Sequence, residues 1–215
     1  MSDLTLRRDI LDELEFQPHI DAAAIGVAVE NGVVSLTGHV GTFAEKIAAE
    51  RAVKSVKGVR AVAEEIEVHL PSDLDLDDAT IAARCLDVIR WNVAIPEDRI
   101  QVKVQNGWVT LDGEVDWIYQ KENAQKAVRK LAGVAGIYNM LTLKPQIIVH
   151  DIKTRIEEAL RRNAELDANH IRVTVEGKTV KLEGRVHLWL ERKAAERVAW
   201  AVPGVTHVEN YILIA

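Results

Sequence analysis

The fold follows from one stretch, Glu30-Asn31-Gly32-Val33-Val34-Ser35-Leu36-Thr37-Gly38-His39-Val40, which the chain repeats twice. It returns as Gln105-Asn106-Gly107-Trp108-Val109-Thr110-Leu111-Asp112-Gly113-Glu114-Val115 and as Glu176-Gly177-Lys178-Thr179-Val180-Lys181-Leu182-Glu183-Gly184-Arg185-Val186. Each copy predicts a β-hairpin, because a pair of residues able to take positive φ separates two runs of alternating apolar and polar side chains. A two-residue loop also fixes which residues face each other. The predicted pairs are Val29 with Val34, Val27 with Leu36, Ile25 with Gly38, Val104 with Val109, Val102 with Leu111, Val175 with Val180 and Val173 with Leu182.

The repeat extends beyond the hairpin. The glycine near the end of each stretch stands twenty residues before a second glycine, and a valine follows that second glycine. The copies are offset by 75 and then 71 residues without internal gaps. Self-similarity at a fixed period indicates one structural unit used several times. The glycine pairs are Gly38 and Gly58, Gly113 and Gly133, and Gly184 and Gly204.

Apolar residues recur at helical spacing on both sides of each hairpin. Residues 4–16 carry apolar side chains at i, i+4 and i+8, with Ser2 or Asp3 placed to cap the helix. A second helix is expected over 43–56, ended by Gly58 in the left-handed conformation. The stripes of the first helices are Leu6, Ile10, Leu14; Ile81, Cys85, Ile89; and Ile152, Ile156, Leu160. The stripe of the second helix in the first copy is Ala49, Ala52, Val53 and Val56, and the closing strand carries Val62, Ile66 and Val68.

These elements predict an α+β protein of three tandem αββαβ units, each a small three-stranded sheet with two helices on one face. The units are expected at 1–70, 76–144 and 147–215, with linkers near 71–75 and 144–146 where proline and polar residues break the pattern. A unit of ~65 residues buries only about 60% of its unfolded surface, so docking between units should stabilise it. We therefore expect another unit or a second chain to cover part of the open sheet faces of units two and three. The large side chains there are Trp108, Tyr138, Met140, Tyr211 and Leu213.

Composition and charge narrow the functional class. The net charge of −6 divides into −5 for residues 1–70, −2 for 71–145 and +1 for 146–215. No segment has the concentrated basic footprint of a nucleic-acid-binding protein. Cys85 is the single cysteine, so no intramolecular disulfide can form. The first residues contain no signal-peptide core, and no run approaches the ~18 apolar residues of a membrane span. The expectation is a soluble, cytoplasmic protein.

The order of these elements carries a family resemblance. A helix, a hairpin ending in Leu-x-Gly-x-Val, a second helix, then Gly-Val and a closing strand occur three times. This pattern resembles the BON domain, the bacterial osmotic-shock and nodulation module also called the transport-associated domain. The resemblance implies a non-enzymatic module associated with phospholipid or membrane binding and with protection against osmotic stress. Better-known members are exported and often lipid-anchored, whereas this sequence shows neither a signal peptide nor a lipidation cysteine.

No motif points to catalysis or to a metal. Cys85 corresponds to Ile10 and Ile156 in the other copies, which favours a core residue over a reactive thiol. The seven histidines are scattered, and none pairs at i, i+4 or with a cysteine, so a zinc site has no support. Dinucleotide, P-loop and nucleophile-elbow motifs are not found. We expect no enzyme activity, no catalytic or metal-binding residue and no cofactor.

The most informative positions lie at the start of the second helix. Three large apolar residues in a row cannot all face one core, so at least one should be exposed or packed against a neighbour. These triplets are Trp117-Ile118-Tyr119, followed by Lys121, and Leu188-Trp189-Leu190, followed by Arg192. Aromatic side chains beside cations suit a membrane interface, where rings lie at headgroup depth. They suit an interface between units or chains equally well.

Two functions follow as hypotheses. The first is a phospholipid-associating or membrane-associating protein in osmotic or envelope stress protection, with contact through the two triplets, Lys121, Arg192 and Trp108. The alternative is a protein interaction scaffold or self-associating module without lipid contact. Binding of a small ion through backbone carbonyls leaves no pattern in a sequence and stays open.

Overall fold

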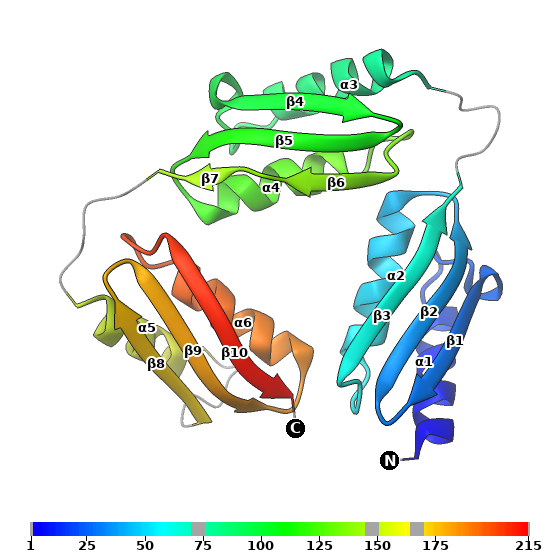
Figure 1. The fold of residues 1–215 in the computed structure, drawn as a ribbon, viewed down its shortest axis with the longest axis horizontal. Helices are drawn as coiled ribbons and strands as arrows, with labels where there is room; N and C mark the ends of the chain where they lie inside the picture. Colours follow the sequence, from blue (N-terminus) through cyan, green and yellow to red (C-terminus); the bar gives the residue numbers. More distant parts are fainter. Residues whose placement is uncertain (1, 70–75, 145–150, 164–169, 215) are drawn as a thin grey trace.

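The protein is built from three αββαβ units (Figure 1). The computed structural model describes residues 2–69, 76–144, 151–163 and 170–214. The expected linkers lie largely outside these residues, since 70–75 and 145–150 are not described. The elements of the first unit are α1 (Asp3–Phe16), a 3₁₀ turn (Ala22–Ala24), β1 (Ile25–Glu30), β2 (Val33–Val40), α2 (Phe43–Ser55) and β3 (Ala61–Val68).

The second and third units repeat this order. Unit two consists of α3 (Asp78–Arg90), a 3₁₀ turn (Glu97–Arg99), β4 (Ile100–Gln105), β5 (Trp108–Val115), α4 (Ile118–Val128), β6 (Gly136–Asn139) and β7 (Thr142–Leu143). Unit three consists of α5 (Ile152–Arg162), β8 (Ile171–Glu176), β9 (Thr179–Val186), α6 (Trp189–Trp200) and β10 (His207–Ile214). The closing strand of unit two is split into β6 and β7, and both pieces pair with β5. The α+β class and the repeated unit are confirmed.

Each sheet keeps its strands in chain order, with the second hairpin strand in the centre. The hairpin is antiparallel, and the closing strand runs parallel to the central strand, so the second helix serves as the crossover. The predicted register is also confirmed, with Val29 opposite Val34 and Val27 opposite Leu36. Asn31 and Gly32 both have positive φ, which the two-residue turn requires. Units two and three pair in the same way.

The glycine that closes the hairpin stretch is fixed by a close approach of the backbone. A Cβ on Gly38 would lie 2.1 Å from the carbonyl oxygen of Ala24, and the φ of Gly38 is +116°. The equivalent distances are 2.0 Å at Gly113 and 2.0 Å at Gly184. No other residue fits this position without moving the chain that enters the hairpin. The threefold recurrence of this glycine is therefore a steric requirement of the unit.

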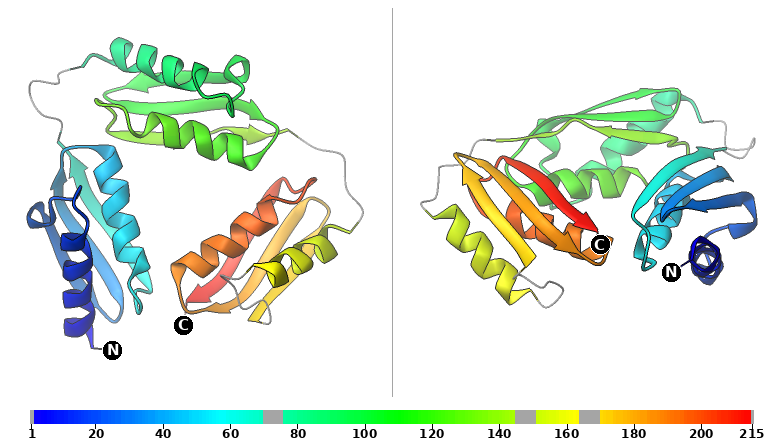
Figure 2. Two further views of the ribbon diagram at one scale, coloured as in Figure 1. Left: turned by 180° about the vertical axis from the view of Figure 1, so that it is seen from behind. Right: turned by 60° about the horizontal axis from the view of Figure 1, so that its bottom comes forward.

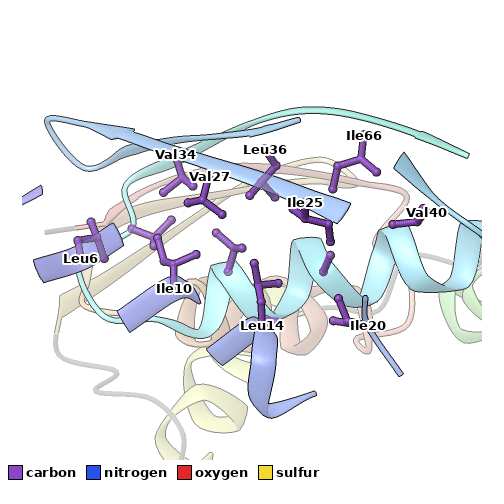
Figure 3. Close-up of a cluster of buried hydrophobic side chains, with 14 residues drawn as sticks. Leu6, Ile10, Leu14, Ile20, Ile25, Val27, Val34, Leu36, Val40 and Ile66 are labelled. Carbon is purple, nitrogen blue, oxygen red and sulfur yellow. The ribbon is translucent and has the colours of Figure 1, made fainter. Parts of the chain in front are cut away.

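Each unit has its own hydrophobic core between the sheet and its two helices. Figure 3 shows the first, where the helix stripe Leu6, Ile10 and Leu14 meets the inner face of the hairpin. Ser2 caps α1 by accepting a hydrogen bond from the backbone N–H of Thr5. The corresponding helix stripes of units two and three are also buried. The cores bear out the apolar stripes expected from the sequence, with both helices on one face of each sheet.

The three units surround a common centre. In Figures 1 and 2 the second helices α2, α4 and α6 lie on the inner side, and the first helices α1, α3 and α5 lie on the outer side. The contact between α2 and α6 joins units one and three, which are not consecutive in the chain. Units therefore dock through their second helices.

The sheet faces remain open, so the expectation that another unit covers them is wrong. Trp108, Tyr138 and Met140 on unit two are 42%, 55% and 59% exposed, and Tyr211 and Leu213 on unit three are exposed as well. The helices supply the docking surface instead, and among the described residues these outward side chains of the two sheets stay exposed. Coverage by a second chain stays a prediction.

Candidate functional site

The helix-start triplets divide between unit docking and exposure. The first residues of the second helices are equivalent in the three copies: Phe43, Ile118 and Trp189. Phe43 is 8% exposed and lies in the core cluster of unit two, with Ile47 packed beside it. A side chain of unit one thus completes the core of the next unit.

Trp189 makes the corresponding contact from unit three to unit one. Its ring packs against the first core, and its indole Nε1 donates a hydrogen bond to the carbonyl oxygen of Val59 at 3.2 Å. The ammonium of Lys54 lies 5.1 Å and the guanidinium of Arg192 lies 5.4 Å from the ring centroid. Such cation–π contacts add stabilisation to the apolar packing. Trp189 is therefore engaged in the junction between units, as one of the two alternatives from the sequence expected.

The other triplet members lie in more open positions. Trp117, Ile118 and Leu188 are half-buried, whereas Tyr119 is 49% and Leu190 is 59% exposed. Each triplet thus has an exposed member, as the crowding argument expected. Ile118 is not among the described side chains that pack on the third core.

The helix caps explain why apolar residues can occupy these starts. In unit one, the side chain of Thr42 accepts from the N–H of Glu45, and Glu45 accepts from the N–H of Gly41, one residue before the cap. In unit two the side-chain oxygen of Gln120 accepts from the N–H of Trp117 at 3.0 Å. Glu191 does the same for Leu188 at 2.9 Å. In these two units the third helical residue thus satisfies the backbone donor of the capping residue, a bond that does not depend on the side chain at that position.

Lys121 and Arg192 serve the fold of their own units. The Nζ of Lys121 donates to the carbonyl oxygen of Leu141 at 2.6 Å, and burial lowers the pKa of this lysine. Arg192 donates from Nε to the carbonyl oxygen of Ile212 at 3.1 Å. Lys46 makes the equivalent bond to Ile66 at 2.6 Å. A basic residue occupies this position in all three copies, and this recurrence in the sequence indicates a structural role.

Trp108 belongs to an exposed apolar patch on the open sheet face of unit two. Its ring stacks on that of Tyr138, with centroids 4.9 Å apart and planes inclined by 23°. The ring also covers Gly136, where a Cβ would meet Trp108 ring carbons at 2.4 Å. Met140 lies two residues beyond Tyr138, in the break between β6 and β7. We call Trp108, Tyr138 and Met140 the sheet patch.

The sheet patch occurs in one copy only. The equivalent residues are Val33, Ala63 and Glu65 in unit one, and Thr179, Glu209 and Tyr211 in unit three. A residue needed for the common fold has an equivalent in every copy, whereas these three positions vary freely among the copies. The sequence identified Trp108 as a candidate contact and Tyr138 and Met140 as outward residues, but did not join them into one site. Their junction depends on the parallel pairing of β5 with β6, which places Trp108 beside Gly136.

Elsewhere the described residues offer little chemistry. Cys85 is fully buried, and burial raises the pKa of its thiol to about 11, as suits a core residue. Among the described residues, no three His, Cys, Asp or Glu side chains gather closely enough to hold a metal ion. No helix in the described parts of the chain combines the length and apolar character needed to cross a bilayer.

Comparison with known proteins identifies the family. The sequence is 25% identical over 149 residues to osmotically-inducible protein Y of Escherichia coli (strain K12), covering 67% of this chain and 74% of that protein. Among solved structures, two of CdsD, a structural protein of the type III secretion system of Chlamydia trachomatis, align over 100% and 98% of this chain and 100% and 92% of theirs, with 13% and 14% identity. Their TM-scores of 0.28 are too low to support any inference. The family model described as BON domain matches residues 2–69, 77–145 and 149–215, so the chain belongs to the BON domain family and contains three copies of the domain.

Proposed function

We propose that the protein is a non-catalytic BON-repeat protein that associates with phospholipid membranes through the sheet patch of its second unit and acts in osmotic or envelope stress protection. The stress role is supported by the similarity to a relative named for osmotic induction. The observation that carries the membrane proposal is the exposed aromatic stack of Trp108 and Tyr138, present in one copy of three.

The physical chemistry of the sheet patch suits the interface of a bilayer. Tryptophan and tyrosine are enriched at headgroup depth because their rings are apolar while their N–H and O–H groups meet water. Met140 adds flexible apolar surface next to the stack. Contiguous exposed apolar side chains on a soluble domain mark a contact with a membrane or a protein. The stacked rings are already ordered, so little side-chain entropy is lost on binding.

The other candidate contacts fit this role less well. Trp189 is engaged with unit one, and Lys121 and Arg192 donate to carbonyl oxygens in their own units. Tyr119 remains available as a second, smaller contact at the start of α4. The proposal therefore moves the main contact from the helix starts to the sheet face.

The internal repeat supplies a matched variant for the test. The triple variant Trp108→Val/Tyr138→Ala/Met140→Glu gives unit two the residues that unit one carries at the equivalent positions. All three native side chains are solvent-exposed, so the variant should fold. Flotation with vesicles of phosphatidylethanolamine and phosphatidylglycerol should recover the native protein with the vesicles and leave the variant in the soluble fraction. Val33→Thr, at a side chain that is also 42% exposed, is the control. Equal flotation of the native protein and the triple variant would contradict the proposal.

An interaction scaffold is the second candidate, and the contact of Trp189 favours it. This protein already uses an aromatic side chain at a helix start to bind a neighbouring BON unit. The exposed Leu190 and Tyr119 could extend such contacts to another protein or a second copy. Sedimentation velocity distinguishes the two functions: a concentration-dependent dimer that Leu190→Ser/Tyr119→Ser abolishes would support the scaffold. A monomer at all concentrations would argue against self-association.

A further inference from the structure

Cations from all three units gather where the second helices meet. Arg51 lies on α2, Arg129 ends α4, and Lys193 lies on α6. Burial and then the charge of Arg51 lower the pKa of Arg129. Burial, Lys54 and Arg51 lower the pKa of Lys193, against the opposing effect of Glu50 and Glu196. Arg51 is therefore close to a cation of unit two and to a cation of unit three. The acidic first unit, with a net charge of −5, contributes a basic side chain here.

A groove lies at this meeting point. It has a volume of about 610 Å³ and is lined by residues of all three units. Arg51 comes from unit one, Arg129 and Lys130 come from unit two, and the exposed Leu190 comes from unit three. A concave site with converging polar groups is the usual setting for a small ligand.

The three cations that line the groove have no direct ionic partner among the described residues. Within the described parts of the chain, Arg51, Arg129 and Lys130 make no ion pair and no side-chain hydrogen bond. Two glutamates also line the groove, so its three cations face two acids, but neither glutamate pairs with them: Glu45 accepts from the backbone N–H groups of Asp21 and Gly41, and Glu13 accepts from Gln17. Like charges held close together destabilise a fold unless something neutralises them.

Helix dipoles do not explain this cluster. Cations in the last turn of a helix are stabilised by its dipole, which accounts for Lys54 and for Arg129 on their own helices. Arg51 and Lys193 lie before the last turns of α2 and α6. Lys54 is also neutralised by its ion pair with Glu50. What remains is a set of cations drawn from separate units, in excess of the acids that line the groove and without a direct ion pair.

We infer that the groove binds a phosphate-type oxyanion. Arg51 lies at the centre of this site, Arg129 and Lys130 lie on one side, and Lys193 adds positive charge from the other side. Guanidinium groups suit this ligand because they donate paired hydrogen bonds to its oxygens. The bound anion joins three units whose cations otherwise repel, so it stabilises their arrangement. This site is separate from the sheet patch, and the inference does not depend on the membrane proposal.

The test uses inorganic pyrophosphate and the full chain. Thermal unfolding is followed by tryptophan fluorescence during titration with pyrophosphate, against sodium chloride at the same ionic strength. Pyrophosphate should raise the unfolding temperature of the native protein by several degrees. Arg51→Gln should weaken the apparent affinity at least tenfold, the effect of losing roughly one charged hydrogen bond. Arg84→Gln, at an exposed arginine on the outer helix α3, is the control and should leave the titration unchanged.

A second readout separates ligand binding from a structural role. Without pyrophosphate, Arg51→Gln should match or exceed the stability of the native protein because it relieves repulsion, whereas loss of a structural contact would lower it. An effect of sodium chloride equal to that of pyrophosphate would overturn the inference. Vesicles of phosphatidylglycerol form the other arm. If the vesicles raise the unfolding temperature of the native protein but not that of Arg51→Gln, while pyrophosphate affects both proteins equally, the oxyanion is a lipid headgroup. If neither ligand distinguishes the two proteins, the inference fails. The sheet-patch variant should keep its full pyrophosphate response.

Discussion

The indole Nε1 of Trp189 donates a hydrogen bond to the carbonyl oxygen of Val59, across 130 residues of chain. Val59 follows the glycine that ends the second helix of unit one, and Trp189 begins the second helix of unit three. Phe43 makes the equivalent approach from unit one to unit two. One position of the repeat is thus used both for starting a helix and for holding the neighbouring unit.

Trp189→Ala should loosen the junction between units one and three. The change removes one hydrogen bond and an aromatic contact, which together are worth about 2 kcal/mol at a half-buried site. Small-angle scattering should show a larger radius of gyration, while circular dichroism should show unchanged secondary structure because each unit keeps its own core. Trp91→Ala is the control, since that ring is exposed on the outer helix of unit two. Identical scattering from both variants would mean that the contact contributes nothing.

Gly113→Ala should destabilise the second unit by at least about 3 kcal/mol. Its φ is +130°, and a Cβ would lie 2.0 Å from the carbonyl oxygen of Arg99. In urea, unit two should unfold before the others and separate the transition into two steps. Gly41→Ala is the matched control because its Cβ would meet no atom closer than 3.9 Å. A single transition at the native midpoint would refute the steric account.

Lys121→Gln should lower the free energy of unfolding by about 1–2 kcal/mol, because the carbonyl oxygen of Leu141 loses a charged donor. The exposed Lys103 provides the control variant Lys103→Gln. Chemical denaturation measures both. Flotation with anionic vesicles should be the same for Lys121→Gln and native protein. A loss of flotation without a loss of stability would instead give Lys121 a direct role at the membrane.

Cys85 should be unreactive towards a thiol reagent at pH 8 in the folded protein and react at once in denaturant. Burial raises the pKa of its thiol from 9.0 to about 11, so the folded state keeps the proton that the unfolded state loses. Stability should therefore fall between pH 9 and 11, by about 1.4 kcal/mol per pH unit at most. Cys85→Val should remove this contribution to the pH dependence. Rapid labelling of the native protein would show that the thiol is accessible.

The sequence was most informative where the physics is local. Alternation and a two-residue turn set the pairing of Val29 with Val34, and the recurring Gly38 position marked a place where a side chain cannot fit. Helix stripes such as Leu6, Ile10 and Leu14 were equally plain. In each case the signal and its cause lie within one unit.

Contacts between units left weaker signals. No periodicity links Trp189 to Val59, because the contact depends on how two folded units approach each other. The open sheet face around Trp108 was expected to be covered, since small units need docking, but the helix starts supply that docking. The structural role of Lys121 was predictable from the repeat, because the equivalent positions of the other copies also hold basic residues, Lys46 and Arg192, which make the same bond.

The most direct test of the membrane account measures the fluorescence of Trp108 itself. The difference between the emission of the native protein and that of Trp108→Val isolates this ring among the five tryptophans. With phosphatidylethanolamine and phosphatidylglycerol vesicles brominated in the acyl chains, this difference emission should shift to the blue and be quenched. An emission unchanged by vesicles that nevertheless bind the protein would show that the sheet patch does not touch the bilayer.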